Sequence, residues 1–236
     1  MFDATSFAGM DLSKIVLSIG GLGTAAYGVV DATKGFGGGI SNRGFGDIRK
    51  VVSRLIPQRE AGTGHDAAVS LDSSLQTLRA NWLNGMALGD QKAVAKALIK
   101  LNLRGETAHH MAEATGVSKD VLKKIAEKLG TEEALTQPET DVYGRFDLLL
   151  SALLDQGYQR ADQRYRNSAK LLAVFVAVFL ALVGGRIVAG EAFFSSGVDV
   201  CRALLAGLLA TPLAPVAKDL SSAIQAAAKV AQSWNK

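Results

Sequence analysis

The sequence predicts an all-α integral membrane protein with about three transmembrane helices and a small helical cytoplasmic domain. Three observations support this prediction. Hydrophobic residues make up 48% and charged residues 20% of the 236 residues. Mean hydropathy is +0.18, which is apolar for a soluble domain. Three long runs carry no charge, and the segments between them place apolar residues at helical spacing.

The uncharged runs hold sixteen, fifteen and fifteen residues, at Ile15–Val30, Leu171–Gly185 and Ala203–Ala217. A transmembrane helix needs roughly 20 apolar residues, so each run is slightly short by itself. Long basic side chains at the ends extend each run because they reach toward lipid headgroups. These flanking residues are Lys14, Lys170, Arg186, Arg202 and Lys218. The alternative is a soluble all-α core that encloses the runs.

Basic residues gather on one side of the first two runs. Residues 31–60 hold six Lys and Arg against three acids, and four more basic residues (Arg160, Arg164, Arg166, Lys170) precede the second run. Basic loops stay in the cytoplasm. We therefore expect a multi-pass protein of the cell (inner) membrane, with residues 31–170 and the C-terminus cytoplasmic and the N-terminus outside. No signal peptide is predicted, since the first run lacks a basic segment before it.

Glycine is concentrated near the start, with eleven of the 25 glycines in the first 50 residues. The pattern Gly21-x-Gly23-x-x-Ala26 matches a dinucleotide-binding fingerprint, but that fold needs further strands that the chain lacks. The favoured interpretation is helix packing. Gly20, Thr24 and Gly28 repeat at four-residue spacing, which predicts a face where another helix approaches closely.

A basic amphipathic helix is predicted from Asp47 to Ile56, ended by Pro57. Arg49, Lys50 and Arg54 alternate with apolar residues, so this helix is predicted to lie on the inner leaflet. The alternative is an ordinary surface helix.

The next segment contains a pattern similar to a helix-turn-helix. Glu106–Thr115 and Lys119–Leu129 form the two expected helices, with Gly116 ending the first and Ser118 capping the second. A DNA-binding version would use Lys119, Lys123 and Lys124. Residues 61–169 hold 13 basic and 14 acidic residues, however, so we expect no nucleic-acid binding and favour a simple helix pair.

A long apolar stripe begins at Asp141 and continues without proline into the second run. If residues 141–190 are one helix, its length is roughly 75 Å. The alternative is two helices broken near Gly157 or Asn167. The stripe needs a covering partner, either the domain at 67–135 or the same stripe of a neighbouring subunit.

Pro212 and Pro215 are expected to kink or end the third run, and an amphipathic helix follows. Its Trp234 suits the headgroup region, and the alternative is that this helix packs against another helix. Four ionisable residues lie between the second and third runs and are possible intramembrane polar residues: Arg186, Glu191, Asp199 and Arg202. The favoured interpretation is that they mark the short outer loop of a hairpin.

Four segments result: 1–57, a glycine-rich transmembrane helix and basic elbow; 58–140, a cytoplasmic helical domain; 141–217, a striped helix leading into a transmembrane hairpin; and 218–236, an amphipathic helix. The single cysteine, Cys201, excludes an intrachain disulfide. We predict no metal site and no cofactor, since the histidines are few (His65, His109, His110) and the adjacent pair diverges by about 100° on a helix.

No catalytic motif is present, so the expected function is non-enzymatic. The prediction is an oligomeric scaffold or membrane anchor that docks an unidentified cytoplasmic protein, with the lipid bilayer and further copies of the chain as its other partners. The alternatives are an oligomeric ion channel or pore and a membrane-tethered DNA-binding regulator. A nucleotide-dependent enzyme is the last alternative.

Overall fold

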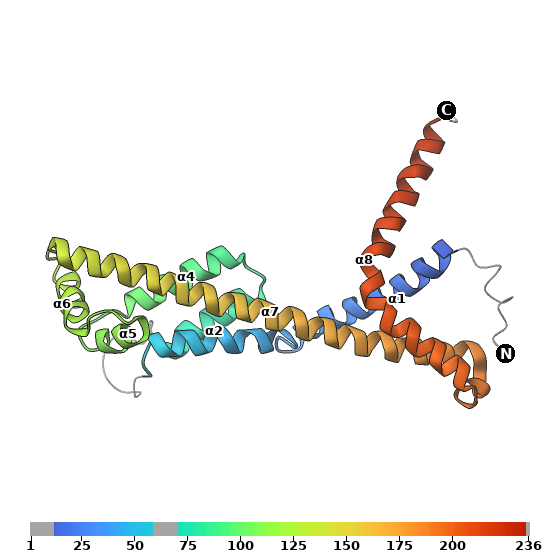
Figure 1. Cartoon of the computed structure of the whole chain (residues 1–236), viewed down its shortest axis with the longest axis horizontal. Helices are drawn as coiled ribbons and strands as arrows, with labels where there is room; N and C mark the ends of the chain where they lie inside the picture. Colours follow the sequence, from blue (N-terminus) through green and yellow to red (C-terminus); the bar gives the residue numbers. More distant parts are fainter. Residues whose placement is uncertain (1–11, 59–69, 235–236) are drawn as a thin grey trace. The chain divides into compact units, whose positions relative to one another are not determined.

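The computed structural model describes residues 12–58 and 70–234, with side chains described as far as residue 226. Every regular element in this part of the chain is helical (Figure 1). In chain order they are α1 (Leu12–Ala32), η2 (Thr33–Gly35), α2 (Ser41–Leu55), α3 (Leu71–Leu83), α4 (Leu88–Leu101), α5 (Ala108–Thr115), α6 (Lys119–Gly130), α7 (Gln137–Ala189), η4 (Gly190–Ser195) and α8 (Gly197–Trp234). The all-α prediction is confirmed.

The helices form two compact units. Unit 1 comprises the chain up to Gly39 and from Arg166 onward, and unit 2 comprises Ile40–Tyr165. The division differs from the predicted segments in two places. Helix α2 belongs to unit 2 rather than to the first predicted segment, and α7 contributes residues to both units.

Unit 2 has one hydrophobic core, to which α2 to α6 and the first part of α7 contribute. The stripe predicted on α7 contributes to this core, and five of its residues are at most 2% exposed: Phe146, Leu150, Leu154, Tyr158 and Ala161. Burial of each large apolar side chain stabilises the fold by about 1.5–3 kcal/mol. The stripe is therefore covered by its own domain and needs no second copy for that purpose.

Helix α7 is continuous, without a break at Gly157 or Asn167. Gly157 is instead a contact point, because a Cβ there would lie 2.8 Å from Val51 Cγ2 on α2. Gly44 on α2 has the reciprocal role, since its Cβ would lie 2.7 Å from the Ala161 carbonyl oxygen. Two glycines thus let α2 and α7 pack closely.

Local sequence explains several helix ends. The Thr136 backbone N–H donates to Glu139 Oε2 at 2.8 Å, which is half of a capping box at the start of α7. Gly116 ends α5 in the left-handed region, with φ of +72°, as expected for glycine at this position. Ser118 is the N-cap residue of α6, as predicted, although its side chain makes no capping hydrogen bond.

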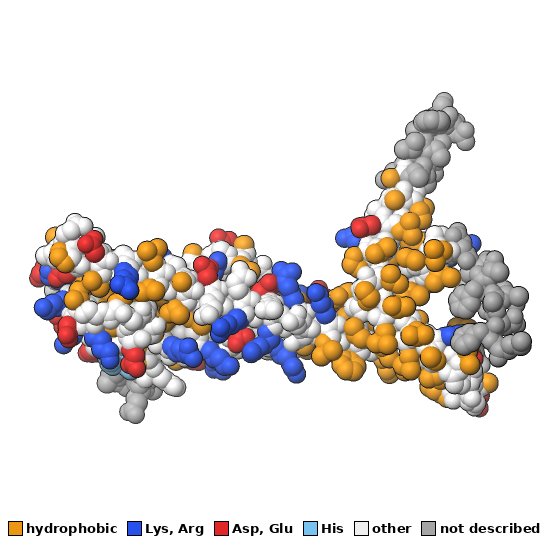
Figure 2. All heavy atoms as spheres, in the orientation of Figure 1, with side chains coloured by type: hydrophobic (Ala, Val, Ile, Leu, Met, Phe, Trp, Pro, Cys, Tyr) orange, Lys and Arg blue, Asp and Glu red, His pale blue; other side chains and the backbone are white. Residues whose placement is uncertain are grey.

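Unit 1 contains α1, the second part of α7, η4 and α8. Three helical stretches in the described residues are long and apolar enough to cross a membrane: Leu12–Gly35, Gln137–Ser195 and Gly197–Ala226. Large apolar side chains are exposed on this unit, among them Phe175 (65%) and Phe179 (64%), and Figure 2 shows hydrophobic side chains over its visible face. Such a surface fits a lipid environment better than water.

Helix α8 contains Pro212 and Pro215 in its interior and runs unbroken to Trp234. Its ribbon changes direction along its length (Figure 1), as expected where proline removes a backbone hydrogen bond. The prolines therefore do not end the helix, and the predicted C-terminal helix is the second part of α8.

Candidate functional sites

Helix α2 presents two different faces. Its apolar residues, including Phe45, Ile48 and Val52, are buried in the core of unit 2. The predicted membrane-surface residues Arg49, Lys50 and Arg54 are exposed. The apolar face is covered by protein, so α2 cannot insert that face between lipid headgroups. The burial of this face agrees with the alternative interpretation of a surface helix, and contact of Arg49, Lys50 and Arg54 with a membrane surface stays a prediction.

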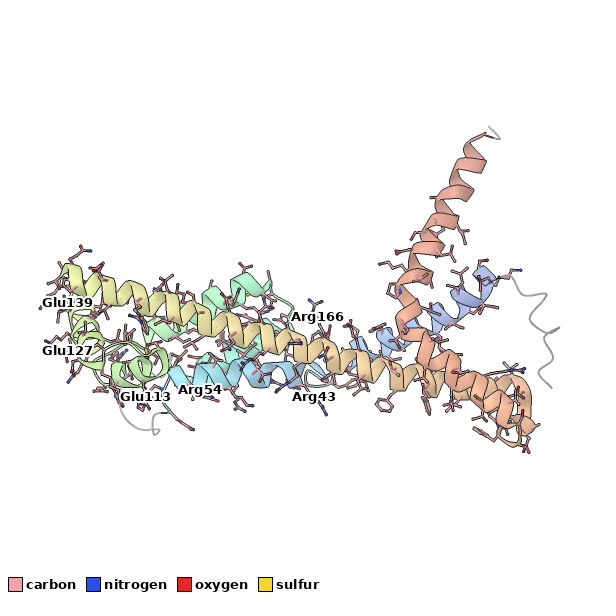
Figure 3. The ribbon with its side chains drawn as sticks, in the orientation of Figure 1. Arg43, Arg54, Glu113, Glu127, Glu139 and Arg166 are labelled. Atoms are coloured by element: carbon pink, nitrogen blue, oxygen red, sulfur yellow. The ribbon has the colours of Figure 1, made fainter. Side chains whose placement is uncertain are left out.

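The exposed side of α2 carries no acidic residue. Its only acid, Asp47, is buried on the core side, where Oδ2 lies 3.2 Å from Arg164 Nη1 of α7. Arg160 lies one helical turn before Arg164 and is also exposed. We call this surface the basic face of unit 2, and it comprises Arg43, Arg49, Lys50, Arg54, Arg160 and Arg164. Figure 3 labels Arg43 and Arg54 on it.

Sequence reasoning found only part of the basic face. No sequence pattern indicates that α2 packs beside α7, so the sequence alone does not place Arg43, Arg160 and Arg164 on one surface with Arg49, Lys50 and Arg54. Trp234, the fourth predicted membrane-surface residue, has a side chain that lies outside the described residues.

The helix pair α5 and α6 lies near the C-terminal end of α2, and Figure 3 labels Glu113 beside Arg54, with Glu127 and Glu139 farther along. The exposed side of α6 mixes Lys119, Lys123 and Lys124 with Asp120 and Glu127. This alternation of charge does not concentrate positive potential as a phosphate backbone requires. His109 and His110 are exposed, and His109 Nδ1 is 2.9 Å from the Glu106 carbonyl oxygen.

Three lysines on α4 pair with two aspartates on α7. Lys92 Nζ lies 2.5 Å from Asp155 Oδ1, and Lys96 Nζ lies 2.6 Å from Asp147 Oδ2. Lys100 also pairs with Asp147. Burial alone would raise the pKa of Asp147, but hydrogen bonds from Lys100 and Lys96 outweigh it and lower that pKa. Asp147 is therefore held in its charged form, and the ion pairs of this cluster connect α4 to α7.

Glu139 is a second carboxylate held ionised. Lys128 Nζ lies 2.7 Å from Glu139 Oε2. The hydrogen bond from Lys128, followed by the one from the Thr136 backbone N–H, lowers the pKa of Glu139 to about 2. This carboxylate joins the end of α6 to the start of α7.

In unit 1, α1 and α8 meet through small residues. A Cβ on Gly20 would lie 2.1 Å from Ala217 Cβ, and one on Gly23 would lie 2.0 Å from the Ala210 carbonyl oxygen. The predicted close-contact role therefore fits Gly20. Thr24 and Gly28 lie on the exposed side of α1, and nothing approaches within 4 Å of a Cβ on Gly28. Gly23, which the spacing argument left out, forms the contact instead.

The four ionisable residues of the hairpin form two local pairs. Arg186 Nη2 lies 3.0 Å from Glu191 Oε1, and Arg202 Nη1 lies 3.2 Å from Asp199 Oδ1. Both pairs lie close to η4, which joins α7 to α8. Each charge has a neighbour of opposite sign within its own stretch of chain, as in the favoured interpretation of an outer loop.

The part of the chain that the structure describes contains no group of three or more His, Cys, Asp or Glu residues able to hold a metal ion. Comparisons of this chain with protein-family models, with curated proteins and with solved structures found no match.

Proposed function

We propose that the protein is a non-enzymatic multi-pass membrane protein that serves as an anchor or scaffold. Three helices of unit 1 hold it in the cell membrane, and unit 2 stands in the cytoplasm and docks a protein partner. The observation that carries this proposal is the contrast between the two surfaces. Unit 1 exposes large apolar side chains, whereas unit 2 encloses its apolar stripe and exposes charge.

The basic face supports the cytoplasmic placement of unit 2. Its residues flank in sequence both the first and the second apolar run, as the bias of basic residues toward the cytoplasm requires. The basic face has six basic side chains, and the exposed side of α2 has no acid, so this surface suits the anionic headgroups of the inner leaflet. Each Lys or Arg near such a surface contributes about 1 kcal/mol of electrostatic attraction. We assign the mixed-charge surface of α5 and α6 to the protein partner.

The structure favours neither alternative function. A pore would gather Arg186, Glu191 or Asp199 around water, and the described pairs are local. A DNA-binding regulator would need a basic recognition helix, and α6 alternates basic and acidic residues.

Single cysteines test the topology. In a Cys201→Ala background, Ser195→Cys places an exposed thiol in η4 and Ser53→Cys places one on α2. A membrane-impermeant maleimide added to intact cells should label Ser195→Cys at once and Ser53→Cys only after the membrane is opened. The background chain without cysteine is the control. If both thiols react from the same side, the proposed topology is wrong.

A further inference from the structure

Unit 1 contains an apolar groove between α1, α7 and α8, with a volume of about 510 Å³. This volume is within the range of about 300–1,000 Å³ that ligand sites occupy. Ile19 and Leu22 line it from α1, and Leu180 and Val188 line it from α7. Small residues create the space, namely Ala181 and Gly184 on α7 and Ala203 and Ala206 on α8.

The groove extends along one end of the helices only. At the inner end, Ala26, Ala177 and Ala210 pack against one another from the three helices. Gly207 closes the same region, because its Cβ would lie 2.5 Å from Val178 Cα. The groove therefore has a closed floor and gives no continuous path along the helices.

The length of the groove matches one leaflet. Its α7 wall runs from Leu180 to Ala189. Ten helical residues rise about 15 Å, which is half of the roughly 30 Å hydrocarbon core of a bilayer.

Charged groups occur at the hairpin end of the groove. Asp199 and Arg202 are the charged residues among its described lining, and they pair with each other. The nearby Arg186 pairs with Glu191. This end therefore carries two positive and two negative charges that balance.

We propose that this groove binds one acyl chain of a membrane phospholipid, from the leaflet that the α7–α8 hairpin reaches. The chain lies against the aliphatic walls, and its headgroup is next to the Asp199–Arg202 pair. Among the described lining residues only Ser18, Asp199 and Arg202 have polar side chains, so water finds few hydrogen-bond partners in the groove. A transmembrane helix of a second copy would need a packing surface that extends across the whole bilayer, whereas this groove ends after one leaflet.

The inference requires only that unit 1 lies in a bilayer. It is independent of which side of the membrane unit 2 occupies and of any protein partner. Cysteine labelling can therefore refute the proposed topology without affecting the lipid site, and photo-crosslinking can refute the lipid site without affecting the topology.

Photo-crosslinking with the full chain tests the site. The protein is placed in vesicles of phosphatidylethanolamine and phosphatidylglycerol that contain a small fraction of phosphatidylcholine with a diazirine on one acyl chain. After illumination, adducts are mapped by peptide mass spectrometry. We expect several-fold more adducts on residues 180–189 and 199–206 than on the exposed positions around Phe175 and Phe179.

Gly184→Leu is the decisive variant. A Cβ on Gly184 meets no atom within 4 Å, so the leucine side chain enters the groove without moving the backbone. Gly28→Leu is the matched control, since its Cβ also meets nothing and it lies outside the groove lining. The groove adducts should be lost in Gly184→Leu and kept in Gly28→Leu. Ala203→Phe fills the groove from α8 and repeats the test if Gly184→Leu fails to fold.

Other outcomes overturn the proposal. Adducts spread evenly over the exposed apolar surface indicate ordinary solvation by lipid. Adducts unchanged by both groove-filling variants place the bound chain elsewhere, and a chain-to-chain crosslink at the groove would assign it to a second copy. Because the charges at the hairpin end balance, a diazirine phosphatidylglycerol should give the same yield as the phosphatidylcholine probe.

Discussion

Gly23→Ala tests whether α1 and α8 are held together by close backbone contact. The added Cβ would lie 2.0 Å from the Ala210 carbonyl oxygen, about 1.4 Å short of the 3.4 Å at which ordinary contact begins. The obstacle is backbone, which cannot rotate away as a side chain can. The two helices must therefore separate around this point, and neighbouring small-residue contacts, such as Gly20 against Ala217, are weakened with it.

The cost follows from the size of this displacement. Forcing one methyl group into a well-packed contact destabilises that contact by about 1–3 kcal/mol. A factor of ten in an equilibrium corresponds to about 1.4 kcal/mol, so local opening of the α1–α8 contact should become roughly 5- to 140-fold more frequent.

Hydrogen exchange with mass spectrometry of the full chain in detergent measures this opening. Backbone amides in peptides from α1 and α8 should exchange faster by the same factor. In a Trp234→Phe background, Trp82 fluorescence monitors unit 2, where the Trp82 Nε1 donates to the Ser41 carbonyl oxygen at 2.9 Å, and this fluorescence should not change.

Gly21→Ala is the matched control, two residues away on the same helix. Its Cβ meets no atom within 4 Å, and alanine favours helix over glycine by about 1 kcal/mol. The control should exchange no faster than the parent. If Gly23→Ala behaves like Gly21→Ala, the close contact between α1 and α8 does not exist as described.

Three further predictions concern unit 2. Leu154→Ala removes a fully packed stripe residue and should destabilise unit 2 by about 2–5 kcal/mol in denaturant titrations. The titrations follow Trp82 fluorescence in a Trp234→Phe background, and Leu148→Ala, at an exposed position, should change little. Glu139 has a pKa lowered to about 2 from 4.5, so its stabilising contribution is present above pH 4.5 and is lost as the pH falls toward 2. Glu139→Gln should flatten that part of the stability curve, and an unchanged acid transition would contradict the role of the Lys128 contact. A fluorophore on Ser53→Cys, in the Cys201→Ala background, should report contact of the basic face with phosphatidylglycerol vesicles. That signal should weaken with salt and in Arg49→Gln/Lys50→Gln, and a signal insensitive to both would refute the lipid assignment.

The sequence was sufficient to predict the three helices that are apolar enough to cross a membrane and the stripe on α7, since both depend on local composition and periodicity. It was insufficient to predict which helix covers the stripe. Gly157 illustrates the difference, because a glycine within a helical pattern is equally compatible with a break and with a close contact. Only the position of Val51, more than a hundred residues away in the chain, distinguishes the two.

The small-residue face of α1 shows the limit of a fixed spacing. With 3.6 residues per turn, each four-residue step turns about 40° beyond a full turn, so Gly20, Thr24 and Gly28 drift around the helix. The buried residues are Gly20, Gly23, Ala26 and Val30, which are separated by steps of three, three and four residues. A pattern that followed the helical period would have selected Gly23 and excluded Gly28.

The basic helix α2 raises a different question, because an apolar face at helical spacing is the same whether lipid or protein covers it. Two residues on that face distinguish the cases. Asp47 would be costly against acyl chains, whereas within a protein it can pair with a basic side chain such as Arg164. Gly44 contributes no apolar area to a lipid interface, but it allows the close approach of Ala161 and Trp82. An acid and a glycine on the apolar side therefore indicate a protein-covered helix, and this leaves the opposite, basic side of α2 as the only one available to headgroups.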